Sequence, residues 1–300
     1  MNRQREGGIS WTNTTWNPVT GCSKVSQGCK NCYAEREWAR LSGYSRSVYR
    51  GRDFTDVRTH SERLAWPLRL KKPHMIFVNS MSDLFHEKVP EEFILEVFET
   101  MAECEQHRFQ ILTKRPERMV RLMPEIYEQL CYPSSGCPVS EERKPLPNVW
   151  LGVSIEDQAT ADERIPRLLR TPAAVRFLSY EPALGPIDLG RSYPCGYYCD
   201  EKIGHVDHPF WSRVNSDIHW VIIGTESGPQ RREMKLEWAE KVLEDCRLSG
   251  VSVFVKQLPI GGKVSKKPEE WPAHLRVQEF PETKEGLTAA TAKPSGKESD

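Results

Sequence analysis

The chain has 300 residues, of which 38% are apolar and 28% charged, a composition typical of globular proteins. Lysine plus arginine and aspartate plus glutamate number 42 each, so no overall positive charge attracts a polyanion. No apolar run approaches the roughly 20 residues of a membrane span. The first residues, MNRQREGGIS, hold no apolar signal-peptide core, so we expect a cytoplasmic protein that makes no membrane contact.

Short apolar runs, each about the length of one strand, alternate with stretches of helical periodicity. Most runs lack strict alternation, which is typical of strands buried on both faces. The runs are Met75–Val78, Phe109–Leu112, Val149–Val153, Val175–Leu178, Trp220–Ile223 and Val251–Val255. Helices are expected over Cys32–Leu41, Glu91–Glu105, Ala159–Leu169 and Leu236–Leu248. Pro166 should make the last turn of the third helix irregular. The alternation predicts an α/β fold with a parallel sheet, and its length favours a partial, TIM-like (β/α) barrel.

Two segments interrupt this alternation. Residues 131–147 are rich in Pro, Ser and Glu, and residues 189–219 combine cysteines and histidines with many aromatic residues. Both are interpreted as insertions into one barrel domain that covers residues 1–260. Residues 261–300 are a predicted C-terminal extension, and its polar tail after Pro281 is expected to be disordered.

Polar or charged residues follow every predicted strand, where parallel α/β folds carry their chemistry. Loop starts are polar in many proteins, so a polar residue after one strand is a weak signal. Polar residues after all six predicted strands are stronger evidence for a binding site. A ring of this kind suits a polar ligand that has an amine, a carboxylate and a ribose. The strand-end segments are Asn79–Asp83, Thr113–Arg115, Ser154–Asp157, Ser179–Pro182, Gly224–Gly228 and Lys256–Gln257.

Three cysteines near the N-terminus, Cys22, Cys29 and Cys32, have the spacing Cys-x6-Cys-x2-Cys. Thiolates are the ligands of iron–sulfur clusters, and four is their usual number. Three nearby cysteines without an obvious fourth predict a [4Fe–4S] cluster with one iron open to another ligand, as in open catalytic metal sites. A structural zinc site completed by a distant Cys or His, or three unrelated thiols, are the alternatives.

The two insertions hold four more cysteines, which would form a zinc site or an auxiliary cluster if the insertions meet in space. These residues are Cys131, Cys137, Cys195 and Cys199. Their spacing is not a standard finger pattern, so exposed or packed single thiols are the alternative. Cys104 and Cys246 lie on helical faces and are predicted core residues.

Several motifs along residues 9–258 form one pattern, which resembles a phage-associated three-cysteine family that is similar to radical S-adenosylmethionine enzymes. The motifs are Trp11-Thr-x-x-Thr-Trp-Asn-Pro18, Gly21-Cys22, Gly28-Cys-x-x-Cys-Tyr-Ala34, Leu112-Thr-Lys-Arg-Pro116, Trp150-Leu-Gly-Val-Ser154, Arg176-Phe-Leu-Ser-x-Glu-Pro182, Ile223-Gly-x-Glu-Ser-Gly228 and Phe254-x-Lys-Gln257. The two insertions and the tail lie outside the resemblance.

The resemblance implies a partial (β/α) barrel in which Cys22, Cys29 and Cys32 hold the cluster. Its open iron would bind the amino and carboxylate groups of S-adenosylmethionine. Reductive cleavage of that cofactor yields a 5′-deoxyadenosyl radical, with an electron from a reductase or flavodoxin. The six-residue first gap departs from the commonest pattern, Cys-x3-Cys-x2-Cys, so the loop geometry is expected to differ.

The resemblance also implies roles for strand-end residues. The candidate cofactor-binding residues are Ser80, Ser82, Asp83, Lys114, Ser154 and Glu156. The first three would face the methionine amino group, the fourth its carboxylate, and the last two the ribose. Candidates for catalytic roles are Glu181, Glu226 and Lys256. Helix capping by Asp83 and a surface ion pair of Lys114 and Arg115 are the alternatives.

Three functions follow as hypotheses. The first is a radical isomerase that acts on an aminoacyl (glycinyl)-modified thymidine in phage DNA, a hypermodification that evades restriction. It would work in the host cytoplasm and would flip its base out of the duplex. The insertion aromatics either stack on that base or pack the insertion; they are Tyr197, Tyr198, Phe210 and Trp211. The second is a radical DNA-base repair lyase, although no hydrogen-donor cysteine is identified. The third is a non-catalytic, zinc-bound nucleic-acid-binding module, which the zero net charge disfavours.

Overall fold

In the part of the chain that the structure describes, eight strands form one sheet whose order follows the chain, β1-β4-β5-β6-β7-β8-β9-β10. Neighbouring strands are parallel throughout, except that β10 is antiparallel to β9. The strands are β1 (Thr14–Trp16), β4 (Met75–Val78), β5 (Arg108–Thr113), β6 (Val149–Ile155), β7 (Val175–Tyr180), β8 (Trp220–Gly224), β9 (Ser252–Ile260) and β10 (Lys263–Ser265). This computed structural model describes residues 9–130, 145–190 and 217–282. The predicted α/β fold with a parallel sheet is confirmed.

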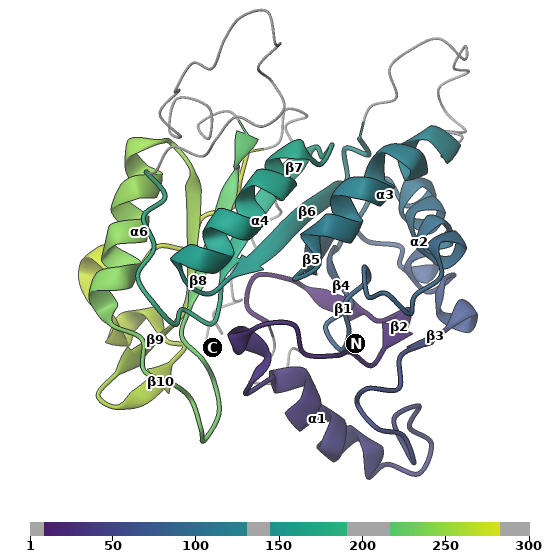
Figure 1. Cartoon of the computed structure of the whole chain (residues 1–300), viewed down its shortest axis with the longest axis horizontal. Coiled ribbons are helices and arrows are strands. Elements are labelled where there is room, and N and C mark those ends of the chain that lie inside the picture. Colours follow the sequence, from purple (N-terminus) through teal and green to yellow (C-terminus); the bar gives the residue numbers. More distant parts are fainter. Residues whose placement is uncertain (1–8, 131–144, 191–216, 283–300) are drawn as a thin grey trace, which may run out of the picture.

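Helices connect most of these strands, because parallel neighbours need a crossover connection. They are α1 (Tyr33–Ser42), α2 (Glu91–Glu103), α3 (Pro116–Gln129), α4 (Gln158–Arg170) and α6 (Leu236–Leu248). In Figure 1, α2, α3, α4 and α6 line the outside of the sheet, whereas α1 stands apart from them at the bottom. A second, two-stranded sheet pairs β2 (Val19–Thr20) with β3 (Arg58–Thr59) beside β1.

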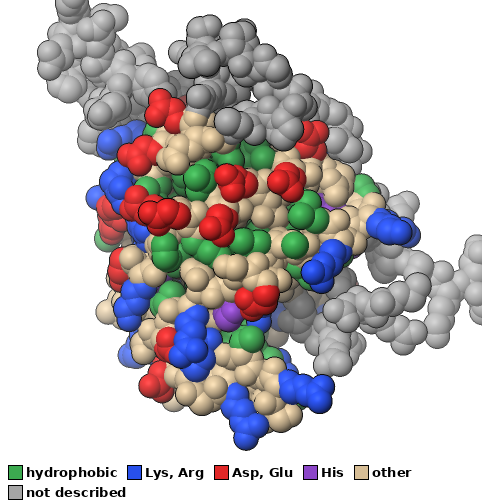
Figure 2. All heavy atoms as spheres, turned by 90° about the vertical axis from the view of Figure 1, so that its right-hand side faces the viewer, with side chains coloured by type: hydrophobic (Ala, Val, Ile, Leu, Met, Phe, Trp, Pro, Cys, Tyr) green, Lys and Arg blue, Asp and Glu red, His purple; other side chains and the backbone are tan. Residues whose placement is uncertain are grey.

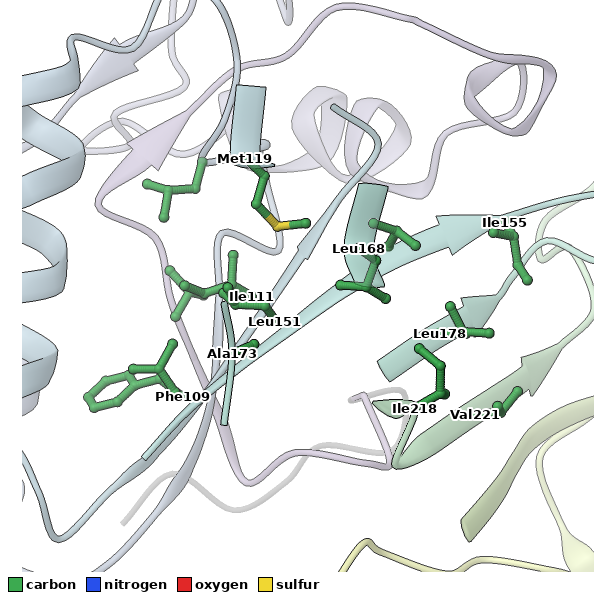
Figure 3. Close-up of a cluster of buried hydrophobic side chains, with 14 of the residues drawn as sticks. Phe109, Ile111, Met119, Leu151, Ile155, Leu168, Ala173, Leu178, Ile218 and Val221 are labelled. Atoms are coloured by element: carbon green, nitrogen blue, oxygen red, sulfur yellow. The ribbon is translucent and has the colours of Figure 1, made fainter. Parts of the chain in front are cut away.

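The main hydrophobic core lies between α2, α3, α4 and α6 and the outer face of the sheet. Alternate strand residues, such as Ile111, Leu151 and Leu178, point outward into it and are at most 1% exposed. Figure 3 shows them on the same side as Met119 of α3 and Leu168 of α4. Cys104 and Cys246 are both fully buried in this core, as the sequence predicted.

The opposite face of the sheet is concave and holds an aromatic cluster centred on Trp220. The ring centroids of Trp220 and Trp11 lie 6.0 Å apart, and those of Trp220 and Trp150 lie 5.8 Å apart. Trp11 precedes β1, which lies five strand positions from β8 in the sheet order. In a flat sheet such a separation would be about 24 Å at roughly 4.8 Å per strand. The sheet therefore curves strongly, and β1 and β10 form its two edges.

Residues that follow β9 also pack onto this sheet. Trp271 and Leu275 are at most 1% exposed, and the ring of Phe280 lies 5.3 Å from that of Trp220. The predicted domain boundary at residue 260 stays a prediction, and residues 283–300 lie outside the described part. No helix within the described ranges is long and apolar enough to cross a membrane.

Two elements were missed by the sequence analysis, and one expectation is corrected. The strand β1 and the helix α3 were not predicted from the sequence, because β1 is only three residues long and α3 contains Pro124. The expected irregular last turn of α4 is wrong, because the helix continues past Pro166 to Arg170. The burial of Ile165 and Leu168 in the core holds that turn in place despite the missing N–H group.

The outer surface of α2 is acidic. Five of its glutamates are exposed, namely Glu91, Glu92, Glu96, Glu99 and Glu103. Figure 2 shows acidic side chains gathered among apolar ones on the side of the molecule that carries α2 in Figure 1. Such a surface does not offer the positive charge with which proteins bind a nucleic-acid backbone.

Candidate functional site

Residues 21–32, called the cysteine loop below, connect β2 to α1 and carry the three predicted ligands. The loop starts at Gly21, whose N–H donates to the carbonyl oxygen of Met81 after β4 (3.2 Å). Gly21 has a φ of +92°, and a Cβ there would lie 2.9 Å from the carbonyl carbon of Asp56, so glycine is required. Cys29 ends a short 3₁₀ helix, and Cys32 directly precedes α1.

Hydrogen bonds tie the cysteine loop and the start of α1 to the carboxyl ends of strands that are not neighbours. The Ser26 hydroxyl donates to Glu156 Oε1 after β6 (2.9 Å), and Asn31 Nδ2 donates to Glu226 Oε2 after β8 (2.9 Å). The Tyr33 hydroxyl donates to a backbone carbonyl oxygen after β4. The loop therefore lies across the concave opening at the carboxyl ends of the strands.

Glu156 is the centre of the polar contacts beneath the loop. It is fully buried, and its Oε1 atom accepts hydrogen bonds from Ser26 and from Arg164 Nη1 (3.2 Å). Lys114 Nζ lies 3.3 Å from the same oxygen. The other oxygen, Oε2, is buried and has no hydrogen-bond partner in the described structure. Because buried polar atoms normally have partners, this oxygen fits a ligand that donates a hydrogen bond, such as a ribose hydroxyl.

The thiols of the loop are half-buried and interact electrostatically. Burial raises the pKa of Cys22 to about 12, the Asp83 carboxylate adds to that rise, and the Arg115 guanidinium opposes it. Burial also raises the pKa of Cys32, while N–H groups at the start of α1 lower it. A Cys29 thiolate would raise the pKa of the Cys22 and Cys32 thiols by charge repulsion. A metal centre relieves this mutual repulsion, since it binds thiolates and releases their protons.

The three thiols of the cysteine loop have the donor chemistry of an iron–sulfur site. Within residues 9–130, 145–190 and 217–282, no three His, Cys, Asp or Glu side chains converge on one metal ion. The three sulfurs on one short loop suit an iron–sulfur cluster. The buried Glu156 Oε2 atom, which has no partner in the described structure, suits a polar co-ligand.

Two of the three candidate catalytic residues form an ion pair. Lys256 Nζ of β9 lies 2.5 Å from Glu181 Oε1 after β7, and both side chains are less than one-fifth exposed. Gly224 of β8 lies between them, and a Cβ there would be 3.2 Å from Glu181 Cδ. Glu226 instead pairs with Arg232. Burial opposes ionisation of Glu226, but hydrogen bonds from Arg232 and Asn31 lower its pKa overall.

A family model described as "Protein of unknown function (DUF5131)" matches residues 6–298 of the chain. The chain belongs to this family. No curated protein sequence matches it significantly. A solved structure of spore photoproduct lyase complexed with dinucleoside spore photoproduct has a TM-score of 0.38 and 9% sequence identity, over 79% of this chain and 75% of that one. A likeness at this level does not establish a shared fold or activity.

The candidate residues after β4 are bonded within this DUF5131 chain. Ser80 Oγ donates to Asn17 Oδ1 (3.2 Å), and Ser82 Oγ donates to the carbonyl oxygen of Val19 (2.9 Å). Asp83 accepts from the Thr113 hydroxyl (2.8 Å) and from a backbone N–H at the start of the next loop. It caps no helix, because α2 begins only at Glu91. Cofactor contacts by these three residues stay predictions, as do those of Lys114 and Ser154.

The alternative interpretation of Lys114 and Arg115 as a surface ion pair is wrong. Arg115 is 8% exposed, and Lys114 turns to Glu156 rather than to the solvent. Sequence reasoning also missed Ser26 and Asn31, which fasten the loop. Their only signal was a position inside the three-cysteine motif. The proposed second metal site, at Cys131, Cys137, Cys195 and Cys199, lies outside the described residues.

Proposed function

We propose that this DUF5131 protein is a radical S-adenosylmethionine enzyme. The observation that carries the proposal is the position of the cysteine loop. It lies across the opening at the carboxyl ends of a strongly curved parallel sheet, the edge at which such folds bind ligands. The curvature supports the interpretation of the sheet as a partial barrel of the radical S-adenosylmethionine type.

Cys22, Cys29 and Cys32 would hold the [4Fe–4S] cluster. When bound and reduced by a reductase or flavodoxin, the cluster supplies the electron that cleaves S-adenosylmethionine. The protein's own residues bind and orient the cofactor. Glu156 Oε2 would accept a hydrogen bond from a ribose hydroxyl, and Lys114 would neutralise a carboxylate at the same opening.

For the substrate, we propose a thymidine in DNA or a nucleotide that carries an aminoacyl group, which the enzyme isomerises. The Lys256–Glu181 pair supports this choice, because its opposite charges complement the carboxylate and the amine of a glycinyl substituent. When a zwitterionic group binds, Lys256 would pair with its carboxylate and Glu181 with its amine, in place of their pairing with each other. Neither buried charge would then lack a partner.

The test of the reaction class is anaerobic purification, reconstitution with iron and sulfide, and EPR spectroscopy. After addition of dithionite and S-adenosylmethionine, we expect 5′-deoxyadenosine, and none from the Cys22→Ala/Cys29→Ala/Cys32→Ala triple variant. Protein that holds only zinc and yields no 5′-deoxyadenosine would overturn the proposal in favour of a zinc-bound module.

The test of the substrate compares two DNA oligonucleotides, one with glycinyl-modified thymidine and one with a thymine photodimer. Isomerisation predicts a product of unchanged mass and altered chromatographic retention from the first. Turnover of only the photodimer would assign the protein to repair. Lys256→Met should weaken turnover of the zwitterionic substrate, while uncoupled formation of 5′-deoxyadenosine persists.

Gly28→Ala should reduce cluster assembly severalfold without unfolding the protein. A Cβ at position 28 would lie 2.7 Å from Glu156 Cδ, so the cysteine loop or the carboxylate must move. Iron and sulfide per chain after reconstitution measure the effect. Gly43→Ala is the matched control, since its Cβ would approach only the carbonyl oxygen of Arg40, at 3.4 Å. Equal iron contents in the two variants would show that the close approach is dispensable.

A further inference from the structure

Arg115 is a buried cation at the first cysteine. Its Nη1 atom donates to Cys22 Sγ (3.7 Å) and lies 3.2 Å from Asp83 Oδ2. Its Nη2 atom donates to the hydroxyl (2.8 Å) and the carbonyl oxygen (3.2 Å) of Ser23. Its Nε atom donates to Glu87 Oε2 (2.8 Å). All three nitrogens of the guanidinium are therefore used, and the group is fixed against the cysteine loop.

The backbone around Arg115 is equally fixed. Its N–H donates to the Thr113 hydroxyl (2.9 Å), and Pro116 occupies the first position of α3. The Thr113 hydroxyl in turn donates to Asp83 (2.8 Å). Because the side chain is 9% exposed, water screens its charge poorly. The cation cannot turn away from the sulfur without leaving Asp83 unpaired in the interior.

We infer that Arg115 is a positioning residue that raises the reduction potential of the iron–sulfur cluster. The inference rests on the proposed function, because it assumes a cluster on Cys22. Three thiolates make the oxidised cluster anionic, and the added electron makes it more so. A fixed positive charge and a hydrogen bond to a ligand sulfur therefore stabilise the reduced form more than the oxidised form. Asp83 neutralises part of this charge and therefore lowers the reduction potential.

The experiment is an EPR-monitored redox titration of the reconstituted wild-type protein and its variants. Arg115→Met removes the cation and leaves the Asp83 charge facing the sulfur. At a fixed potential we expect the ratio of reduced to oxidised cluster to fall about tenfold, the effect of losing one charge-assisted hydrogen bond, which corresponds to about 59 mV. Arg115→Lys keeps the charge and should recover part of the shift. Asp83→Asn removes a negative charge near the cluster and should raise the potential.

The matched control is Arg121→Met, which removes the same charge from an exposed position on α3, where it pairs with Glu91. Its potential should equal that of the wild type. If Arg115→Met does not fold, as judged by thermal melting, the Asp83→Asn variant tests the inference. A higher potential than that of the wild type supports it, and a lower potential contradicts it. Clusters of unchanged potential in both variants would overturn this inference and leave the proposed function standing. A wild-type protein that assembles no cluster would overturn both.

Discussion

Replacing Glu156 with alanine is expected to lower the free energy of unfolding by about 3–5 kcal/mol. The carboxylate is fully buried and pairs with Arg164, which is 3% exposed. Without its partner, the guanidinium of Arg164 stays charged in a site that water does not reach. Lys114, whose side chain is 19% exposed, can turn to the solvent and adds little to the loss. Denaturant unfolding followed by circular dichroism measures the change.

Two controls separate the buried charge from other effects of the substitution. Glu91→Ala removes an exposed carboxylate paired with Arg121, and should cost about 0–1 kcal/mol. The double variant Glu156→Gln/Arg164→Met removes both charges and should recover much of the stability, since it leaves neither charge of this pair buried without its partner. A loss below about 1 kcal/mol for Glu156→Ala would contradict the buried pair.

Trp220→Ala should also cost about 3–5 kcal/mol, for a different reason. The side chain is fully buried at the centre of the aromatic cluster, with rings of Trp150, Phe177 and Phe280 within 5.8 Å of its centroid. Alanine would leave a cavity among rigid rings and remove the indole N–H that donates to Glu279 O (2.8 Å). Thermal or denaturant unfolding measures the decrease in the free energy of unfolding.

Trp220→Phe is the matched variant, because it keeps a ring in the cluster and should lose less than half as much stability. Tyr44→Ala, at a side chain that is 56% exposed, should be nearly neutral. Trp150 and Trp220 lie at the amino-terminal ends of β6 and β8, whereas the cysteine loop is bonded to residues that follow the carboxyl ends of these strands. Trp220→Ala should therefore keep the wild-type iron content below its melting temperature, and a parallel loss of iron would contradict this separation.

The positions of most elements follow from local patterns. The apolar run Met75–Val78 is a strand with the predicted limits, and the striped segment Leu236–Leu248 is a helix with the predicted limits. Local signals failed where the element was short or contained proline, as in β1 and α3. All seven residues of β6 are buried, as expected for an apolar run without alternation.

Pairings between distant residues were beyond local reasoning. Lys256 and Glu181 were separate candidates in the sequence, and the structure makes them one ion pair. For Arg115, the sequence left open whether it belongs to the site at the strand ends or to a surface ion pair. Its burial results from the approach of the cysteine loop and of Asp83, which lie 93 and 32 residues away in the chain.

The sequence by itself determined the alternation of strands and helices, the three cysteines on one short loop, and the polar residues at the strand ends. These features depend on residues that lie close together in the sequence. They can therefore be predicted from hydrophobic periodicity and from the spacing of the ligand residues. Only the tertiary structure decided that the loop lies over Glu156, which polar atoms remain without partners, and which charges pair. Those outcomes depend on the order and curvature of the sheet, which bring residues more than 100 positions apart into contact.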